Sequence, residues 1–408
     1  MKTILLCGNG LSGEIIPTIK SWGYKVALIS EFPFDVGTSD ADFFIEANSK
    51  DPDVALCAAK SFVGSGVKID GVISLCWDTA ISVATIADEL NLNSVSIASA
   101  KKATYKNLRS DTFREHGIPS PRYVVINSYE HLLQRIKEFN FPIILKPIDQ
   151  SSSKGVIRVD SMGSLGFAYA HCKSFSESKG IILNEYLVGS EHSVEGLMIS
   201  GEFYMTAISD RVFQYEKYHP FFVEVGDVMP TSRPEDVKNK LYEVTRNAAL
   251  SLGLTTGVVK GDLVYSMTQG VKVLEIAARL GGPRFGTEMV PLSNGTNILK
   301  ATIQQAVGDE INMDLLLSKF SKGMVNRSVT LDPGIIESVS DINSLKRCEG
   351  YYSFKWWGSE LKVGDEIQPT QYGCGGVAYI IAVGETRIKA IENADRIERG
   401  IKIITSSR

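Results

Sequence analysis

The chain has 408 residues, of which 44% are hydrophobic and 22% are charged. This is the composition of an ordinary globular protein. The formal net charge is −4, so the chain lacks the overall basic character of many nucleic-acid-binding proteins, and we expect no nucleic-acid partner. The length exceeds what one hydrophobic core normally serves, which predicts two or three domains.

The cysteines and the apolar segments indicate the compartment. The six cysteines are scattered and form no CxxC pair, which fits neither a zinc site nor a dense disulfide framework. No apolar run approaches the roughly 20 residues that a membrane span needs, and the first residues lack a signal-peptide cleavage pattern. The sequence therefore predicts a cytoplasmic protein with no membrane partner.

Strand and helix signals alternate over the first hundred residues. Continuous apolar runs predict buried strands, and each is followed by a helical stretch. This alternation is typical of a parallel α/β domain, which we place at residues 1–100. The expected strands are 3–7, 25–29 and 71–75, and the expected helices are 14–22 and 79–90.

Three glycines after the first strand leave two interpretations open. Gly8, Gly10 and Gly13 have the GxGxxG spacing of a dinucleotide-binding loop, which would suit an oxidoreductase. That loop is normally confirmed by an acidic residue after the second strand, and Glu31 lies near this position without settling the matter. The other interpretation is that the glycines permit a tight turn and close packing of the following helix.

Two further units follow. Residues 101–187 predict a linker helix and a small α+β domain, and residues 188–408 predict a larger domain rich in strands. In the first unit we expect helices at 100–116, 129–139 and 165–174 and strands at 123–126, 142–147, 156–159 and 181–183. In the second we expect strands at 192–199, 202–209, 257–265 and 272–277 and a helix at 235–252.

Two lysines and a loop of small residues suit phosphate binding. Lys106 lies on a helix before the GIPSP turn, and Lys146 ends the apolar strand IILKP. A strand-borne ammonium is a suitable point charge for phosphate. The loop that follows allows backbone N–H groups to approach an anion, and its candidate residues are Ser151, Ser152, Ser153, Lys154 and Gly155.

Two carboxylates carry the most specific signal. Lys260 and Asp262 are two residues apart on one expected strand, so their side chains share a face. Glu275 lies on the next strand, across a short turn, in an otherwise apolar run where an acid needs a partner. Two carboxylates without histidine or thiolate suit Mg²⁺ or Mn²⁺. Asp262 and Glu275 are therefore the predicted metal ligands.

Arg279 follows Glu275 by four residues and precedes Gly281 and Gly282. The two glycines leave room for a ligand beside the backbone, and the planar guanidinium can hold a carboxylate or an acyl phosphate. A simple ion pair between Arg279 and Glu275 is the alternative.

Taken in order, these elements resemble the ATP-grasp superfamily of carboxylate–amine ligases. The resemblance rests on Lys106, the ILKP strand, the small-residue loop, the NEYLVGSE segment, and Lys260-x-Asp262 with the EIAARLGG run. It is greatest for the bacterial L-amino-acid ligases, which share the ExAAR form. The fold implied has a Rossmann-like N-terminal domain, a small α+β lid and a larger β-rich domain.

The resemblance also implies roles. Lys106, Lys146 and the 151–155 loop would hold ATP phosphates, and Asp262 and Glu275 would hold magnesium. Lys260 and Arg279 would steady the transferred phosphoryl group. The adenosine would be bound by Glu185, Tyr186, Leu187 and Glu191, with the first three offering backbone groups to adenine. The expected partners are a small carboxylic acid and an amine, and the family suggests a homodimer.

Some residues leave alternatives open. Many members of the superfamily carry a further metal-binding asparagine where this chain has Ala277. The metal site is then leaner, or the protein binds ATP without turning it over. Glu224, in a stretch similar to an acceptor loop, is a candidate for binding an amine, and Arg284 for binding a second carboxylate. The sequence does not identify the acid or the amine.

Overall fold

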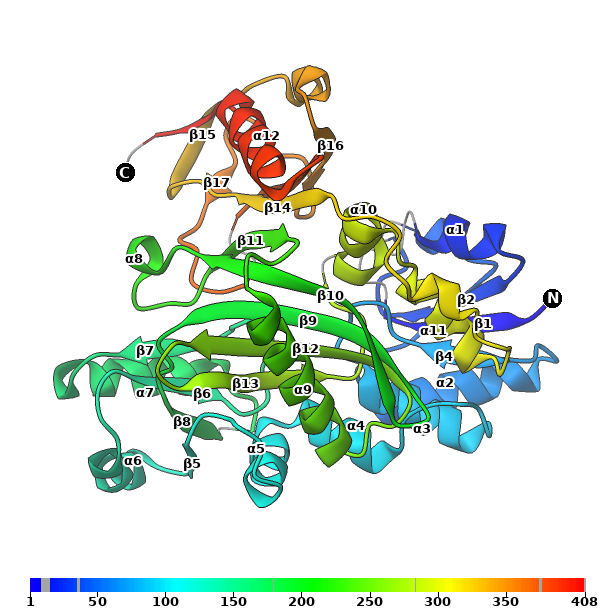
Figure 1. The fold of residues 1–408 in the computed structure, drawn as a ribbon, viewed down its shortest axis with the longest axis horizontal. Helices are drawn as coiled ribbons and strands as arrows, with labels where there is room; N and C mark the ends of the chain where they lie inside the picture. The colour runs from blue at the N-terminus through cyan, green and yellow to red at the C-terminus, as the bar shows by residue number, and fades with distance from the viewer. Residues whose placement is uncertain (9–14, 35–36, 179, 283, 374–375, 407–408) are drawn as a thin grey trace.

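Four β-sheets organise the described part of the chain in the computed structural model (Figure 1). The structure describes residues 1–8, 15–34, 37–178, 180–282, 284–373 and 376–406. Figure 1 shows the N-terminal strands at the right, the sheet of β5 to β8 at the lower left and the C-terminal elements at the top. No helix within the described ranges is long and apolar enough to cross a membrane.

The first sheet is parallel, with strand order β3-β2-β1-β4. Alternate residues of β1 face opposite layers: Ile4 and Leu6 pack with α1, whereas Leu5 and Cys7 pack with α2 and α3. The buried strands are therefore apolar throughout, as both covered faces require. The elements are β1 (Thr3–Cys7), α1 (Ile15–Ser21), β2 (Lys25–Ser30), β3 (Phe43–Glu46), α2 (Pro52–Gly64), β4 (Gly71–Ile73) and α3 (Ala80–Glu89).

The structure supplies a packing reason for the first glycine of the GxGxxG spacing. Gly8 has φ +87°, and a Cβ atom there would lie 2.4 Å from the Trp77 ring. Gly10 and Gly13 lie outside the described residues. Glu31 accepts a hydrogen bond from the Ser49 hydroxyl at 3.3 Å.

The single helix expected over residues 100–116 is wrong. It is two helices, α4 (Ile97–Thr104) and α5 (Lys106–Glu115), separated at Tyr105, whose backbone is extended. Ser96 caps α4 by accepting from the Ser99 N–H, a favourable N-cap arrangement. The break makes Lys106 the first residue of α5, so its side chain leaves a helix end rather than a helix middle.

The small sheet is antiparallel and has the order β5-β8-β6-β7. Apolar side chains of its strands pack against α6 and α7 in one cluster. The elements are β5 (Tyr123–Ile126), α6 (Tyr129–Arg135), β6 (Ile143–Pro147), β7 (Ile157–Val159), α7 (Leu165–Phe175) and β8 (Ile181–Glu185).

The large sheet has eight strands in the order β13-β12-β9-β10-β11-β14-β18-β16. Helix α9 packs on the β12–β13 end and α12 on the β14–β18 end (Figure 1). The strands are β9 (Ser190–Ile199), β10 (Glu202–Phe213), β11 (Glu224–Met229), β12 (Gly257–Ser266), β13 (Gly270–Ala277), β14 (Gly323–Val329), β16 (Tyr351–Trp356) and β18 (Ala378–Gly384). Its helices include α8 (Tyr215–Tyr218), α9 (Glu235–Ser251), α10 (Val290–Asn294) and α12 (Arg387–Gly400).

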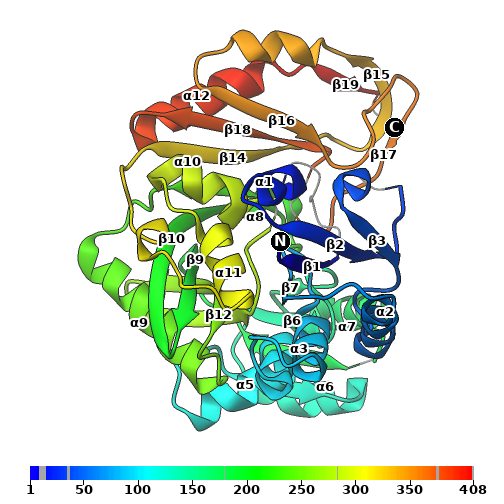
Figure 2. The same cartoon turned by 90° about the vertical axis from the view of Figure 1, so that its right-hand side faces the viewer.

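The C-terminal elements continue this sheet, because β14 pairs with β11 and β18 pairs with β14. A short sheet of three strands, ordered β17-β15-β19, lies beside them (Figure 2). Its strands are β15 (Gly334–Val339), β17 (Glu366–Ile367) and β19 (Ile403–Thr405).

The N-terminal sheet and the large sheet share one hydrophobic cluster. Ile4 and Leu28 of the first sheet belong to the same cluster as Leu197 of β9 and Val258 of β12. Helix α11 (Ile298–Ala306) contributes its apolar face to this cluster and contacts both β4 and β12. The cluster therefore fixes the N-terminal unit against the strands that carry the charged residues described below.

We predict that Leu197→Ala lowers the free energy of unfolding by about 2–5 kcal/mol, because it removes a buried side chain from this cluster and leaves a cavity. Leu197 is fully buried, whereas Leu317 is 59% exposed. Leu317→Ala is the control and should change the free energy by less than about 0.5 kcal/mol. Urea unfolding followed by circular dichroism measures both, and equal values for the two variants would contradict a shared core.

Candidate active site

The two predicted metal ligands lie directly opposite each other. Asp262 on β12 pairs with Glu275 on β13 in the antiparallel ladder, and the register shifts immediately after Asp262. Directly opposed side chains on such a pair lie within about 4.5–5.5 Å at their Cβ atoms. The hairpin thus brings the two carboxylates to one place, as the sequence predicted.

All contacts of the Asp262 carboxylate fall on one oxygen. Oδ1 accepts from the Ser193 hydroxyl at 2.9 Å and from Lys260, and it lies 3.5 Å from an Arg211 nitrogen. Burial alone would raise the pKa of Asp262, but Arg211 and Lys260 hold it well below its usual range. The group is therefore ionised, and Oδ2 has no partner among the described residues.

The Glu275 carboxylate lies near the cations Arg109 and Lys106. Its Oε2 lies 3.5 Å from an Arg109 nitrogen of α5, and burial, which would raise the pKa of Glu275, is outweighed by the charges of Arg109 and Lys106. Oε1 has no partner in the described part of the chain. The sequence reasoning missed Arg109, although its spacing of three residues from Lys106 on a helix was a usable signal.

Lys106 and Lys146 meet beside Glu275. The Lys106 ammonium donates to the carbonyl of Gln150, and burial lowers its pKa. Lys146 forms no hydrogen bond or ion pair with any described residue. Burial, together with the charges of Lys106 and Arg109, lowers the pKa of Lys146 to about 7. A buried cation without a partner is costly, so this position favours an anionic ligand.

The loop after β6 turns tightly and contacts the N-terminal unit. Ser152 and Ser153 have φ values of +53° and +56°, which is an unusual conformation for residues other than glycine. The Ser151 side chain contributes to holding the pKa of Asp78 below its usual range. At Gly155 a Cβ atom would lie 2.7 Å from Pro147, so only glycine fits there.

The segment predicted to bind adenosine is held by ion pairs and ring contacts. Glu185 pairs with Lys272 at 2.6 Å, and the Arg158 guanidinium lies over the Tyr186 ring at 4.6 Å. Both contacts use side chains. The backbone N–H of Glu185 already donates to the carbonyl of Arg122 at 3.0 Å. Leu187 follows the end of β8 in this segment.

Glu191 is more occupied than the sequence suggested. Its carboxylate accepts from Arg211 at 3.1 Å and from the Tyr215 hydroxyl at 2.6 Å. Burial raises the pKa of Glu191, and the Arg211 charge opposes that rise. A ribose hydroxyl would have to share or displace one of these donors.

Arg211 is the second residue that the sequence reasoning missed. It lies on β10 and contacts three carboxylates: Glu224 at 2.6 Å, Glu191 at 3.1 Å and Asp262 at 3.5 Å. Glu224, the candidate for binding an amine, thus forms an ion pair with Arg211. The expected strand 202–209 ends before Arg211, whereas β10 continues to Phe213. The three partners of Arg211 come from different strands, so no local pattern reports them.

Arg279 does not form the ion pair with Glu275 that the sequence left open. Its Nε donates to Asp78 at 2.6 Å and its Nη1 to the carbonyl of Leu280 at 2.9 Å. Asp78 belongs to the N-terminal unit, and although burial would raise its pKa, Arg279 holds that pKa low. Arg284 lies farther along the same segment, buried, with its Nε 2.6 Å from Glu288.

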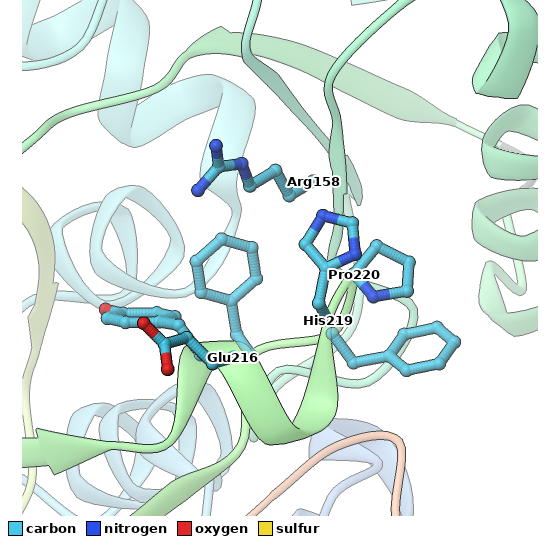
Figure 3. Close-up of a pocket in the computed structure, with 7 residues that line it drawn as sticks. Arg158, Glu216, His219 and Pro220 are labelled. Carbon is cyan, nitrogen blue, oxygen red and sulfur yellow. The ribbon is translucent and has the colours of Figure 1, made fainter.

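Two hollows on the surface are lined by residues other than those of this charged centre. One pocket of about 120 Å³ lies between β7 and the segment around α8 and includes Arg158, Glu216, His219 and Pro220 (Figure 3). Another, of about 590 Å³, is an open groove between Asn93 and Gln305. The first adjoins Tyr186 through Arg158, and it is smaller than typical ligand pockets of roughly 300–1,000 Å³.

The fold combines a small antiparallel sheet with a large one, and buried cations and carboxylates lie together on strands and helices of both. In comparison with known protein families, residues 139–287 match the ATP-grasp domain. This match lies within the part of the chain that carries the small sheet and the β12–β13 hairpin, and the predicted resemblance to the ATP-grasp superfamily is confirmed.

Individual relatives agree with this assignment. The chain is 25% identical over 222 residues to an alanine–anticapsin ligase of Bacillus subtilis, covering 49% of this chain and 46% of that protein. It is 26% identical over 229 residues to a phosphoribosylamine–glycine ligase of Lactococcus lactis, covering 54% of each. The chain thus spans about half the length of these curated relatives.

A solved structure confirms the fold over the whole chain. The L-amino acid ligase from Bacillus licheniformis superposes with a TM-score of 0.84 at 19% identity, covering 100% of this chain and 99% of that one. The predicted fold class, an ATP-grasp fold of mixed helices and sheets, is therefore correct.

We predict that Arg211→Met lowers the free energy of unfolding at pH 7 by about 3–5 kcal/mol, because it leaves buried carboxylates without their counter-charge. Adding Glu224→Gln should recover part of this loss. The control is Arg246→Met, since Arg246 forms an exposed pair with Glu202 at 3.6 Å that contributes about 0–1 kcal/mol. Urea unfolding would speak against the cluster if Arg211→Met and Arg246→Met gave the same value.

Proposed function

We propose that the chain is an ATP-dependent ligase that activates a small carboxylic acid as an acyl phosphate and joins it to an amine. The observation that carries this proposal is the Asp262–Glu275 pair, in which each carboxylate keeps one oxygen free of partners among the described residues, next to Lys106 and Lys146. The ligases named above and the ATP-grasp domain support the same activity.

The residues fit a magnesium or manganese ion. The donors are oxygens only, as a hard cation prefers, and Asp262 and Glu275 would hold it. Within the described residues no set of three His, Cys, Asp or Glu side chains could hold a metal. The protein would therefore supply two ligands, leaving the other positions to phosphate oxygens and water. Bound there, the ion would offset charge on the transferring phosphoryl group.

The nucleotide would lie between the two sheets. Lys106, Lys146 and the 151–155 loop suit the phosphates because they combine unbalanced positive charge with small residues. The backbone of residues 185–187 suits the adenine edge. For the ribose, Glu191 stays our proposal, with the qualification that Arg211 and Tyr215 already engage it.

The chemistry follows from the charges. An oxygen of the acid attacks the γ-phosphorus of ATP, the bond to the β-γ bridging oxygen breaks, and ADP leaves. Lys106, Lys146 and Lys260 offset the negative charge that develops. Arg279 would hold the acyl phosphate through its planar fork. The amine then attacks the acyl carbon and expels phosphate, forming an amide.

The substrates are small molecules in this proposal. Glu224 presents a carboxylate next to Asp227, whose pKa burial raises to about 7 with further help from Glu224. This end of the site is acidic and suits an ammonium group, such as that of an amino acid. Arg284 is buried near the same segment as Arg279 and is our candidate for a second carboxylate.

A second candidate function is nucleotide binding without turnover. Ala277 favours it, because this residue lies two positions after Glu275 and so on the same face of β13, where it offers no metal ligand. An oxidoreductase built on the Gly8–Gly13 loop gains no support from these comparisons.

A substrate screen decides between the two. The protein with Mg²⁺ and ATP is supplied with amino acids and other small carboxylic acids, singly and in pairs, and the nucleotide products are separated. The ligase predicts ADP and phosphate that depend on an added acid. AMP and pyrophosphate would exclude an acyl phosphate, and tight ATP binding with no product on any pair would favour the second candidate.

We predict that Glu275→Gln lowers acid-dependent ADP release by at least about 100-fold, because a neutral amide cannot replace a charge that stabilises the transition state. The thermal unfolding curve should stay close to that of the wild type. The matched control is Glu243→Gln on α9, an exposed glutamate away from the site. Wild-type rates in Glu275→Gln would show that the metal assignment is wrong.

We predict that nucleotide binding at pH 8 takes up close to one proton. Burial lowers the pKa of Lys146 to about 7, so at pH 8 the free protein carries mostly the neutral amine. A phosphate beside it favours the ammonium and draws in a proton, whereas at pH 6 the lysine is already charged. Calorimetric titration with a non-hydrolysable ATP analogue in Tris and in HEPES measures the uptake.

Lys146→Met should abolish this proton uptake. Lys154→Met is the control, since it removes another cation of the phosphate loop and leaves Lys146 in place. Equal uptake in wild type and Lys146→Met would mean that Lys146 does not meet the phosphates.

A further inference from the structure

Glu195 is a buried carboxylate that the proposed chemistry does not use. It lies on β9, fully buried, opposite Lys260 of β12. Side chains two residues apart on a strand share a face, so Glu191, Ser193 and Glu195 form one row. The first two contact residues of the site: Glu191 accepts a hydrogen bond from Arg211, and Ser193 donates one to Asp262.

The third member of the row contacts the segment after β13. The backbone N–H of Gly281 donates to Oε2 of Glu195 at 2.5 Å. A Cβ atom at Gly281 would lie 3.1 Å from Oε2, and one at Gly286 would lie 2.2 Å from Oε1. The two glycines therefore let the backbone close around this carboxylate, which gives the LGG motif a structural reason besides room for a ligand.

Keeping Glu195 here costs stability. Its Oε1 is buried and has no hydrogen-bond partner in the described residues, and such a group typically costs about 1–3 kcal/mol. Burial raises the pKa of Glu195 to about 7, against the opposing effects of the Gly281 N–H, Lys260 and Arg279. An apolar side chain would fill this position at lower cost, so the carboxylate calls for a functional reason.

Arg279, two residues before Gly281, supplies a functional reason for the carboxylate of Glu195. Arg279 reaches Asp78 in the N-terminal unit and bonds the carbonyl of Leu280, so its guanidinium depends on the backbone path of residues 279–281. From β9, the Glu195 side chain accepts a hydrogen bond from this backbone, at the N–H of Gly281.

We propose that Glu195 is a positioning residue, which fixes the segment from Arg279 to Gly286 relative to β12 and β13 by accepting the Gly281 N–H. The backbone that carries Arg279 is thereby held in place relative to the strands of Asp262 and Glu275. The inference rests on the proposed function, because that function gives Arg279 its task, whereas the anchoring of the segment can be measured without any turnover.

The experiment compares Glu195→Ala and Glu195→Gln with a matched control, Met198→Ala. Met198 is also fully buried on β9, and it belongs to a different hydrophobic cluster from Leu280 and Phe285. Three quantities are measured: amide hydrogen exchange of the peptide that covers 278–286, affinity for the ATP analogue without acid, and acid-dependent kcat.

Glu195→Ala should speed exchange in this peptide and lower kcat by about 10–100-fold, the usual effect of removing such a support, with nucleotide affinity changed less than about two-fold. Glu195→Gln keeps an acceptor oxygen and should recover most of the kcat. Met198→Ala should destabilise the fold without either effect. If Glu195→Ala does not fold, Glu195→Asp, which withdraws the carboxylate by one methylene, is tested for the same changes.

Unchanged exchange in the 278–286 peptide would overturn the proposal, and so would a loss of kcat no greater than that of Met198→Ala. A wild-type protein that releases no ADP with any acid would defeat the proposed function instead. In that case the exchange comparison alone still decides whether Glu195 fixes this segment.

Discussion

The ionised carboxylate of Asp262 connects three adjacent strands of the large sheet. Its Oδ1 gathers Ser193 from β9, Arg211 from β10 and Lys260 from its own strand. A buried carboxylate is tolerated only with such partners, so three adjacent strands must keep their register for the group to persist. Because these contacts fix Oδ1, they also fix the direction in which the second oxygen, Oδ2, points.

Charge is distributed unevenly on either side of this pair. Lys106, Arg109 and Lys146 gather near Glu275, whereas Glu191 and Glu224 both pair with Arg211. The cationic side comes from the small sheet and its linker, and the acidic side from the large sheet. In the proposed function, the phosphates of the nucleotide balance the charge of the cations near Glu275. The ammonium group of the substrate balances the charge of the carboxylates near Arg211. Binding would therefore reduce the electrostatic repulsion within each group.

Local patterns predicted the elements whose signals are local. The buried strands of the N-terminal sheet, the β12–β13 hairpin and the opposition of Asp262 and Glu275 follow from apolar runs and from the two-residue period of a strand. The break at Tyr105 escaped prediction because no proline or glycine marks it. Arg109, Arg211 and Asp78 escaped because their partners lie 166, 20 and 201 residues away along the chain, and one sequence contains no record of such pairings.

The continuous ladder from β11 through β14 to β18 has a consequence for the boundaries of the protein. Cutting the chain before β14 would not release a smaller, self-sufficient catalytic unit. It would expose the backbone donors and acceptors of β11, a strand that carries Glu224 and lies next to Arg211 on β10. A bare, well-formed strand edge invites pairing with another molecule, so shortened forms would tend toward aggregation. By pairing with β11, the C-terminal strands therefore cover the sheet edge next to the site.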